Sequence, residues 1–340
     1  MTIKVTVTLL FKNKQLKTKK KQHLLCINEN KRIFLFIFKF IDYREKMKIG
    51  FTLKPRNGNI LDFENQVQDL ENIGAGSAEI PLYELDVISG KKIIQDELNL
   101  LQNITGKSKL KFSIHGSMSV NLLDEEYLND HIEVLKKEIE VCSILNINIL
   151  VTHFGHTSLE TSKNQTKYNQ LISIQKEKYF ELAEIAKKYG VILCIENIFP
   201  YTSGHYTALP SEVSKNISEI NHPNAKTTID FSHAYINCNL QSKDLISELE
   251  TMAPHTEHLH VHDSFGKFKT MDTYIFPEDI TYGQGDIHLP LGWGDIPFDK
   301  IFSTLNLKKD IFFNFELTHR YKKYYSQNIE KAKKLISLMK

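Results

Sequence analysis

The chain has 340 residues, of which 41% are hydrophobic and 25% charged, a balance typical of soluble globular proteins rather than disordered ones. Its net charge of +2 is unevenly divided, because residues 1–46 carry 12 Lys/Arg and 3 Asp/Glu whereas residues 47–340 carry a net charge of −7. The mildly acidic body disfavours a protein that holds nucleic acid electrostatically over its surface. The four cysteines form no CxxC pair, which favours a reducing compartment and predicts a cytoplasmic protein.

The first 46 residues differ from the rest of the chain. They contain the basic run "KNKQLKTKKKQ" and the apolar run "IFLFIFKFI", whose nine residues fall short of the roughly 20 that span a bilayer. We therefore expect no membrane partner. We interpret residues 1–46 as a poorly ordered basic extension outside the native start, because Met47 opens "MKIGFTLKP", the pattern of a first strand; a membrane- or nucleic-acid-binding tail is the alternative.

From residue 48 onward, short apolar or β-branched runs alternate with amphipathic, helix-like stretches, for example 127–145 and 175–190, the second ending on Gly190. Eight alternations predict a parallel eight-stranded (β/α)₈ TIM barrel over residues 47–340. An open doubly wound sheet fits less well, because no GxGxxG follows the first run. The predicted strands are 48–53, 77–82, 109–116, 147–153, 191–197, 225–231, 258–263 and 311–317.

Seven of these eight predicted strands end in ionisable side chains. In a barrel the strand ends meet at one rim, where active sites lie. A crowd of imidazoles and carboxylates is costly unless protons or cations compensate its charge, and we predict a metal site. His, Asp and Glu without Cys suit Zn²⁺ best, with Mn²⁺, Co²⁺ or Fe²⁺ as alternatives, and one to three ions. The strand-end residues are Glu79, His115, His153, Glu196, Asp230, His260 (followed by His262 and Asp263) and Glu316.

Two later segments add candidate ligands. "DFSH" places His233 one helical turn after Asp230, and "GDIHLPLGWGDIPF" places Asp286 and His288 ahead of two glycines that allow a loop to fold over the rim. The connection from residue 264 to about 297 is long, which is typical of functional loops.

As an ordered set, "IHGSMSVNL", "VTHFGH", "CIEN", "TIDFSHA", "HVHDS", "DIHLPLGWGDI" and "FEL" resemble the xylose isomerase-like TIM barrels. That superfamily includes sugar and sugar-phosphate isomerases and epimerases and the endonuclease IV-type AP endonucleases (AP endonuclease family 2), and the resemblance covers residues 47–340. It implies nine ligands for a trinuclear zinc site, namely His115, His153, Glu196, Asp230, His233, His260, Asp286, His288 and Glu316.

Within that set, Glu196, Asp230, His260 and Glu316 resemble the single-metal site of the isomerases and epimerases. In those enzymes the two Glu residues also move protons, which makes Glu196 and Glu316 the candidate catalytic residues. His262 and Asp263 are expected at the rim, where they would contact substrate together with Lys54. His258, one layer deeper in the same strand, is expected to be an interior, hydrogen-bonded residue.

The sequence departs from the nuclease pattern at several points. Met118 replaces a Tyr, "ENIFPYTSGHYTALP" replaces a small Gly-rich turn, and the loop after the first strand offers only Lys54 and Arg56 to a DNA backbone. We therefore predict a divalent-metal-dependent sugar or sugar-phosphate isomerase/epimerase with a small carbohydrate as partner. The alternatives are a zinc phosphodiesterase acting on abasic DNA and a barrel that binds metal without turnover. A homo-oligomer is compatible with either enzyme.

Overall fold

The computed structural model describes residues 48–339, so the predicted extension, residues 1–46, lies outside the described residues. Eight parallel strands close into a barrel in the order β1-β12-β11-β10-β8-β6-β5-β2. This closure confirms the predicted (β/α)₈ barrel and excludes the open doubly wound sheet. The strands are β1 (Lys48–Thr52), β2 (Ser77–Pro81), β5 (Lys111–His115), β6 (Ile149–His153), β8 (Ile192–Glu196), β10 (Ala225–Asp230), β11 (Thr256–Val261) and β12 (Phe312–Phe315).

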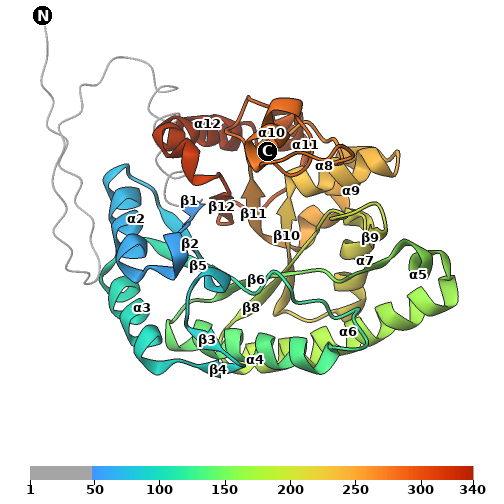
Figure 1. Cartoon of the computed structure of the whole chain (residues 1–340), viewed down its shortest axis with the longest axis horizontal. Helices are drawn as coiled ribbons and strands as arrows, with labels where there is room; N and C mark the ends of the chain where they lie inside the picture. Colours follow the sequence, from blue (N-terminus) through green and yellow to red (C-terminus); the bar gives the residue numbers. More distant parts are fainter. Residues whose placement is uncertain (1–47, 340) are drawn as a thin grey trace, which may run out of the picture. The chain divides into compact units, whose positions relative to one another are not determined.

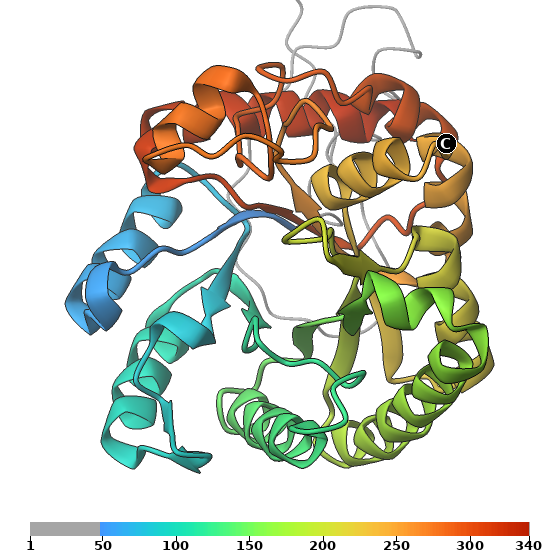
Figure 2. The same cartoon turned by 45° about the vertical axis from the view of Figure 1, so that its right-hand side comes forward.

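Helices follow the strands and surround the barrel in chain order (Figures 1 and 2). Each crossover packs a helix on the outer face of the sheet, so both faces of the strands are shielded from solvent. The strand sequences are therefore rich in apolar residues. The longer helices are α2 (Ile60–Asn72), α3 (Gln95–Lys107), α4 (Leu128–Ile144), α6 (Gln165–Lys188), α7 (Pro210–Ile220), α8 (Phe231–Leu240), α9 (Leu245–Met252) and α12 (Tyr325–Leu338). Among the described residues, no helix is both long and apolar enough to cross a bilayer.

Helix α6 ends where the sequence predicts but begins earlier than predicted. The predicted stop is confirmed, because Gly190 adopts a φ of 71°, a conformation that glycine takes without steric cost. The predicted start near residue 175 was wrong. Asn164 caps the helix by accepting a hydrogen bond from the backbone N–H of Lys167, so the helix begins at Gln165.

The carboxyl end of the barrel carries several short elements. Two antiparallel pairs, β3 (Ile88–Ser89) with β4 (Lys92–Ile93) and β7 (His156–Ser158) with β9 (His205–Thr207), decorate the connections. The long connection after β11 contains the helix α10 (Phe276–Tyr282), and the short helices α5 (Leu159–Lys163) and α11 (Phe298–Thr304) complete the fold.

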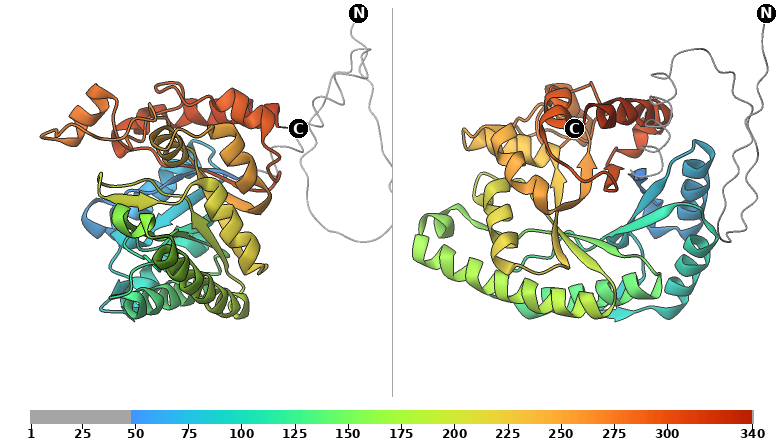
Figure 3. Two further views of the ribbon diagram at one scale, coloured as in Figure 1. Left: turned by 90° about the vertical axis from the view of Figure 1, so that its right-hand side faces the viewer. Right: turned by 180° about the vertical axis from the view of Figure 1, so that it is seen from behind.

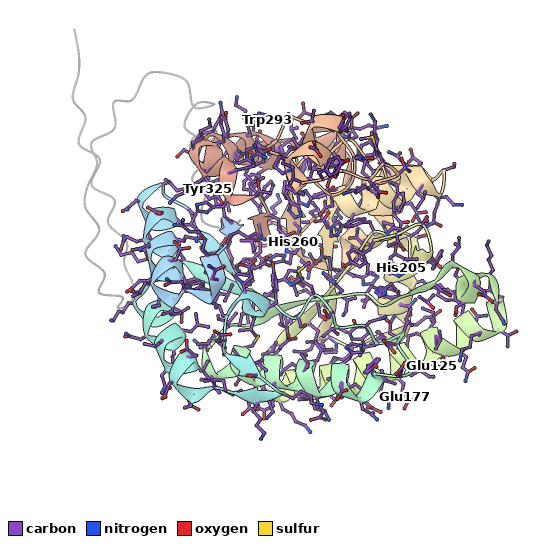
Figure 4. All side chains as sticks on the ribbon, viewed as in Figure 1. Glu125, Glu177, His205, His260, Trp293 and Tyr325 are labelled. Atoms are coloured by element: carbon purple, nitrogen blue, oxygen red, sulfur yellow. The ribbon has the colours of Figure 1, made fainter. Side chains whose placement is uncertain are left out.

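Strand β11 shows how the barrel interior is built. His258, His260 and His262 alternate with Leu259 and Val261, and all five side chains are buried. The aliphatic side chains face the surrounding helices and the imidazoles face the interior, as the period of two predicts. The interior is therefore a polar core, and Figure 4 places His260 at the centre of the ring of strands.

Candidate active site

Glu196, at the end of β8, is the centre of the ionisable cluster. Its Oε2 lies 3.4 Å from His115 Nε2 and 3.9 Å from His153 Nε2, and its Oε1 lies 3.2 Å from both His233 Nδ1 and His260 Nδ1. Parallel pairing brings His153 and Glu196 into register at neighbouring strand ends. Four imidazoles from four elements therefore meet one buried carboxylate.

Glu316 lies just after β12 on another side of His260. Its Oε2 is 3.6 Å from His260 Nδ1, so His260 stands between two carboxylates, those of Glu196 and Glu316. Both carboxylates line the same cavity. Two carboxylates thus face one cavity from the ends of different strands.

Glu79, in β2, contacts the ring nitrogen of His260 that does not face Glu196. The carboxylate of Glu79 lies 3.1 and 3.2 Å from His260 Nε2, which leaves His260 Nδ1 facing Glu196. His258 Nε2 lies 3.2 Å from the same carboxylate, and Thr52 Oγ1 donates to it at 2.9 Å. A carboxylate behind an imidazole fixes its tautomer and raises its basicity, as in many metal sites.

A second cluster surrounds Asp286 at the outer end of the barrel. Asp286 Oδ2 is 2.6 Å from His288 Nε2 and 3.3 Å from His233 Nε2. His288 adopts a φ of 47°, a backbone conformation uncommon for residues other than glycine. His233 links the two clusters, because its other ring nitrogen faces Glu196.

Asp230 ends β10 and caps α8. Its Oδ1 accepts a hydrogen bond from the backbone N–H of His233 at 2.7 Å, and its Oδ2 lies 3.0 Å from His262 Nε2. Each oxygen keeps a second lone pair, so the carboxylate could still bind a cation. The structure thus brings all nine predicted ligands into one connected network.

The network perturbs the protonation of its members. Burial disfavours the charge on Glu196, but His260, His115 and His233 outweigh it and hold the pKa of Glu196 well below its ordinary value. Burial also opposes protonation of His260, yet Glu316, Glu79 and Glu196 raise its pKa well above 6.5. These shifts favour an ionised Glu196 and a protonated His260 when no cation is bound.

The arrangement fits a divalent cation. Both carboxylate oxygens of Glu196 and the Nδ1 of His260 are buried and have no hydrogen-bond partner among the described residues. Buried polar atoms of this kind need a partner, and a cation bound by several of them would supply one. Triplets whose ligand atoms lie within 4.8 Å of one another include His115–His153–Glu196, His115–His260–Glu316 and His262–Asp286–His288.

The predicted substrate contacts divide into two groups. Lys54 lines the cavity, near Glu316 and Tyr83. His262 and Asp263 follow the end of β11, as expected, but neither lines the cavity. Both are buried; the His262 ring stacks 4.1 Å from that of His288, and Asp263 accepts the backbone N–H of Gly292.

The 286–296 loop folds over the end of β11 and covers these side chains. The strand pattern predicts which way they point, but it does not predict the position of this loop. Asp263 also accepts the backbone N–H groups of Ser264 and Ile296, so it anchors that loop. Of the three predicted substrate contacts, only Lys54 lines the cavity.

The family model described as "Xylose isomerase-like TIM barrel" matches residues 67–340. The chain belongs to this family. No curated protein matches the sequence. Solved structures similar to this xylose isomerase-like barrel include a D-tagatose 3-epimerase-like protein, with 18% identity and a TM-score of 0.63, covering 85% of this chain and 98% of that chain.

Two further structures share the barrel. One is a D-allulose 3-epimerase from Methylomonas sp. in complex with D-allulose, with 14% identity and a TM-score of 0.59, covering 85% of this chain and 97% of that chain. The other is a Thermus thermophilus protein soaked with ZnCl₂, with 17% identity and a TM-score of 0.57, covering 84% and 98%. At these identities the likeness establishes the fold.

Some residues of this xylose isomerase-like barrel that face the cavity were missed from the sequence. Tyr83 follows β2, and Phe268 and Phe276 come from the connection that contains α10. Phe199 and Tyr201 lie in the aromatic segment after β8, whose unusual length was the one available signal. Aromatic residues in loops have no periodicity, so their direction is set only by tertiary packing.

Proposed function

We propose that the chain is a divalent-metal-dependent sugar or sugar-phosphate isomerase or epimerase. The observation that carries this proposal is the pair of buried carboxylates, Glu196 and Glu316, that flank His260 and line one cavity. Glu196, Asp230, His260 and Glu316 would hold the cation, with Zn²⁺ as the first candidate. A bound divalent ion would polarise the sugar carbonyl and stabilise negative charge that develops on its oxygen.

The chain's own groups would move the proton. One carboxylate, Glu196 or Glu316, would remove the proton from the carbon next to the carbonyl and so become a carboxylic acid. In an isomerisation the same group would return that proton to the neighbouring carbon; in an epimerisation the other carboxyl group, protonated from solvent, would return a proton to the opposite face. Burial disfavours the charge on Glu316, but His260, Lys54 and His288 lower its pKa and keep it ionised. In its ionised form each carboxylate is available to accept a proton.

Lys54 would position the substrate. Burial opposes its charge, but the neighbouring Tyr83, Glu316 and Glu84 raise its pKa above the ordinary value. A protonated ammonium beside Glu316 can donate hydrogen bonds to a sugar hydroxyl or carbonyl oxygen in the cavity. Glu79 contributes from below by holding His260 in one orientation.

A trinuclear zinc phosphodiesterase acting on abasic DNA is the second candidate. It is favoured by one observation, the second cluster of His233, Asp286 and His288, which the single-metal mechanism does not require. The acidic body and the aromatic loop after β8 argue against DNA as its substrate.

Elemental analysis combined with two activity assays would separate the candidates. One divalent ion per chain, solvent deuterium entering a free ketose, and no incision of an abasic-site duplex would support the isomerase. Three zinc ions with incision would overturn it. Glu196→Gln and Glu316→Gln should each slow deuterium exchange about 10²- to 10⁴-fold.

A further inference from the structure

The cavity above the metal-ligand cluster has two chemically different levels. Its volume is about 440 Å³. The floor is polar and consists of His115, His153, Glu196, His233, Asp286, His288 and Glu316. The aromatic wall, as we call it, consists of Phe199 and Tyr201 after β8 and Phe268 and Phe276 in the connection around α10.

One side of the aromatic wall stands directly on the floor. The Phe199 ring centroid lies 4.9 Å from that of His233, and the Tyr201 ring lies 5.4 Å from that of Phe199. The two rings thus form a continuous apolar surface that leads from the ligand cluster outwards. Tyr201 remains 44% exposed, so its ring has apolar area left to cover.

The other side of the aromatic wall comes from the α10 connection, which extends outward from the barrel (Figure 3). Phe276 lines the cavity and is 42% exposed. Tyr274 and Ile275, the two residues before it, are exposed as well. Apolar surface therefore continues past the mouth of the cavity on this side.

The cavity's two lysines are already opposed by carboxylates. Lys269 Nζ lies 3.0 Å from Asp279, which itself accepts a hydrogen bond from Thr273. Lys54 lines the same cavity as the carboxylates of Glu316 and Glu84. Among the described residues that line the cavity, these are the only Lys or Arg side chains. A phosphate group would compete with these carboxylates for both cations.

We propose that the substrate is an uncharged reducing sugar that carries a second ring at the end remote from its carbonyl. This rests on the proposed function, because the reacting sugar must occupy the polar floor. Its carbonyl end would lie on Glu196 and Glu316, and the second ring would lie between the two sides of the aromatic wall. Cavities of about 300–1,000 Å³ hold ligands of drug size, larger than one hexose.

The test compares three classes of ketose on the full-length, metal-loaded protein. They are the free D-ketohexoses, the same ketohexoses bearing a glucosyl ring at O4 or O6, and their 6-phosphates. Solvent deuterium incorporation gives the relative kcat/KM, and titration calorimetry gives the dissociation constant. We expect the glucosyl ketoses to exceed the free ketoses about 10-fold or more in both measurements.

Variants locate the second ring. Phe199→Ala and Phe276→Ala should each lower the ratio of glucosyl-ketose affinity to free-ketose affinity about 2- to 10-fold, the range of a single aromatic contact. Tyr189→Ala is the matched control, because Tyr189 is an exposed aromatic residue at the end of α6 that does not line the cavity.

The possible failures are distinguishable. Exchange with free ketoses as fast as with glucosyl ketoses would overturn the second-ring inference and leave the isomerase intact. A preference for the 6-phosphates would also overturn it. Exchange with none of the sugars would overturn the proposed function and this inference together.

Discussion

Replacing Glu79 by Gln tests whether the interior of the barrel tunes the proposed metal site. The carboxylate of Glu79 accepts contacts from His260 and His258 at 3.1 to 3.2 Å and hydrogen bonds from Thr52 and Asn314. Gln has nearly the same shape as Glu but no charge. Its side-chain NH₂ group would face partners, such as His260 Nε2, that now donate to the Glu79 carboxylate. His260 then loses the partner that fixes its Nδ1 toward Glu196.

The magnitude follows from these contacts. A hydrogen bond to a charged group contributes about 1.5–3 kcal/mol and a neutral one about 0.5–1.5 kcal/mol, so exchanging the His260 contact alone costs about 1–2 kcal/mol. The mismatched donor adds a similar amount, which gives a loss of about 2–4 kcal/mol in the free energy of unfolding of the metal-free protein. Loss of a residue that hydrogen-bonds to a metal ligand typically weakens metal binding about 10- to 100-fold.

Two measurements check this prediction. Urea unfolding of the metal-free protein gives the stability, and competition with a zinc chelator gives the metal affinity. Glu212→Gln is the matched control, because Glu212 accepts hydrogen bonds from Tyr206 and the backbone of Leu209 but contacts no imidazole of the cluster. A folded Glu79→Gln protein with the metal affinity of wild type would refute the reasoning.

Three further predictions follow from the same contacts. His258→Ala should lower the free energy of unfolding by about 1–3 kcal/mol, measured by urea unfolding, and keep the metal, because it leaves Ser113 without its partner and His258 Nδ1 faces no ligand. Metal-free protein should lose stability as the pH rises above 6.5. The pKa of His260 is higher in the folded than in the unfolded protein, so its stabilising effect is complete below pH 6.5 and disappears as the pH rises through the folded-state pKa; metal-loaded protein should show no such loss. Metal-free protein should also lose stability as the pH falls below 4.5, because the pKa of Glu196 is lower in the folded than in the unfolded protein and protonation then favours unfolding. Thermal unfolding at a series of pH values measures both losses. Gly294→Ala should cost about 1–3 kcal/mol by thermal unfolding, because its Cβ would lie 2.2 Å from the backbone oxygen of Ser264; unchanged stability would contradict the close packing of that loop.

The sequence by itself determined the barrel and the convergence of its ionisable residues. Eight apolar runs separated by amphipathic stretches admit few arrangements, because parallel strands need covering helices on their outer faces. The ends of parallel strands share one rim, so His115, His153 and Glu196 had to meet once the strands were placed. The period of two likewise turned His260 inward, with Leu259 on the other face.

Only the tertiary structure decided what each inward side chain does. Glu79 and His260 are 181 positions apart, and their contact depends on barrel closure and stagger, which no local pattern encodes. The 286–296 loop folds back and buries His262 and Asp263, because the backbone N–H groups of that loop need acceptors and the Asp263 carboxylate supplies them. Loop side chains such as Phe199 and Phe276 follow no periodicity, so only the tertiary structure shows that they line the cavity.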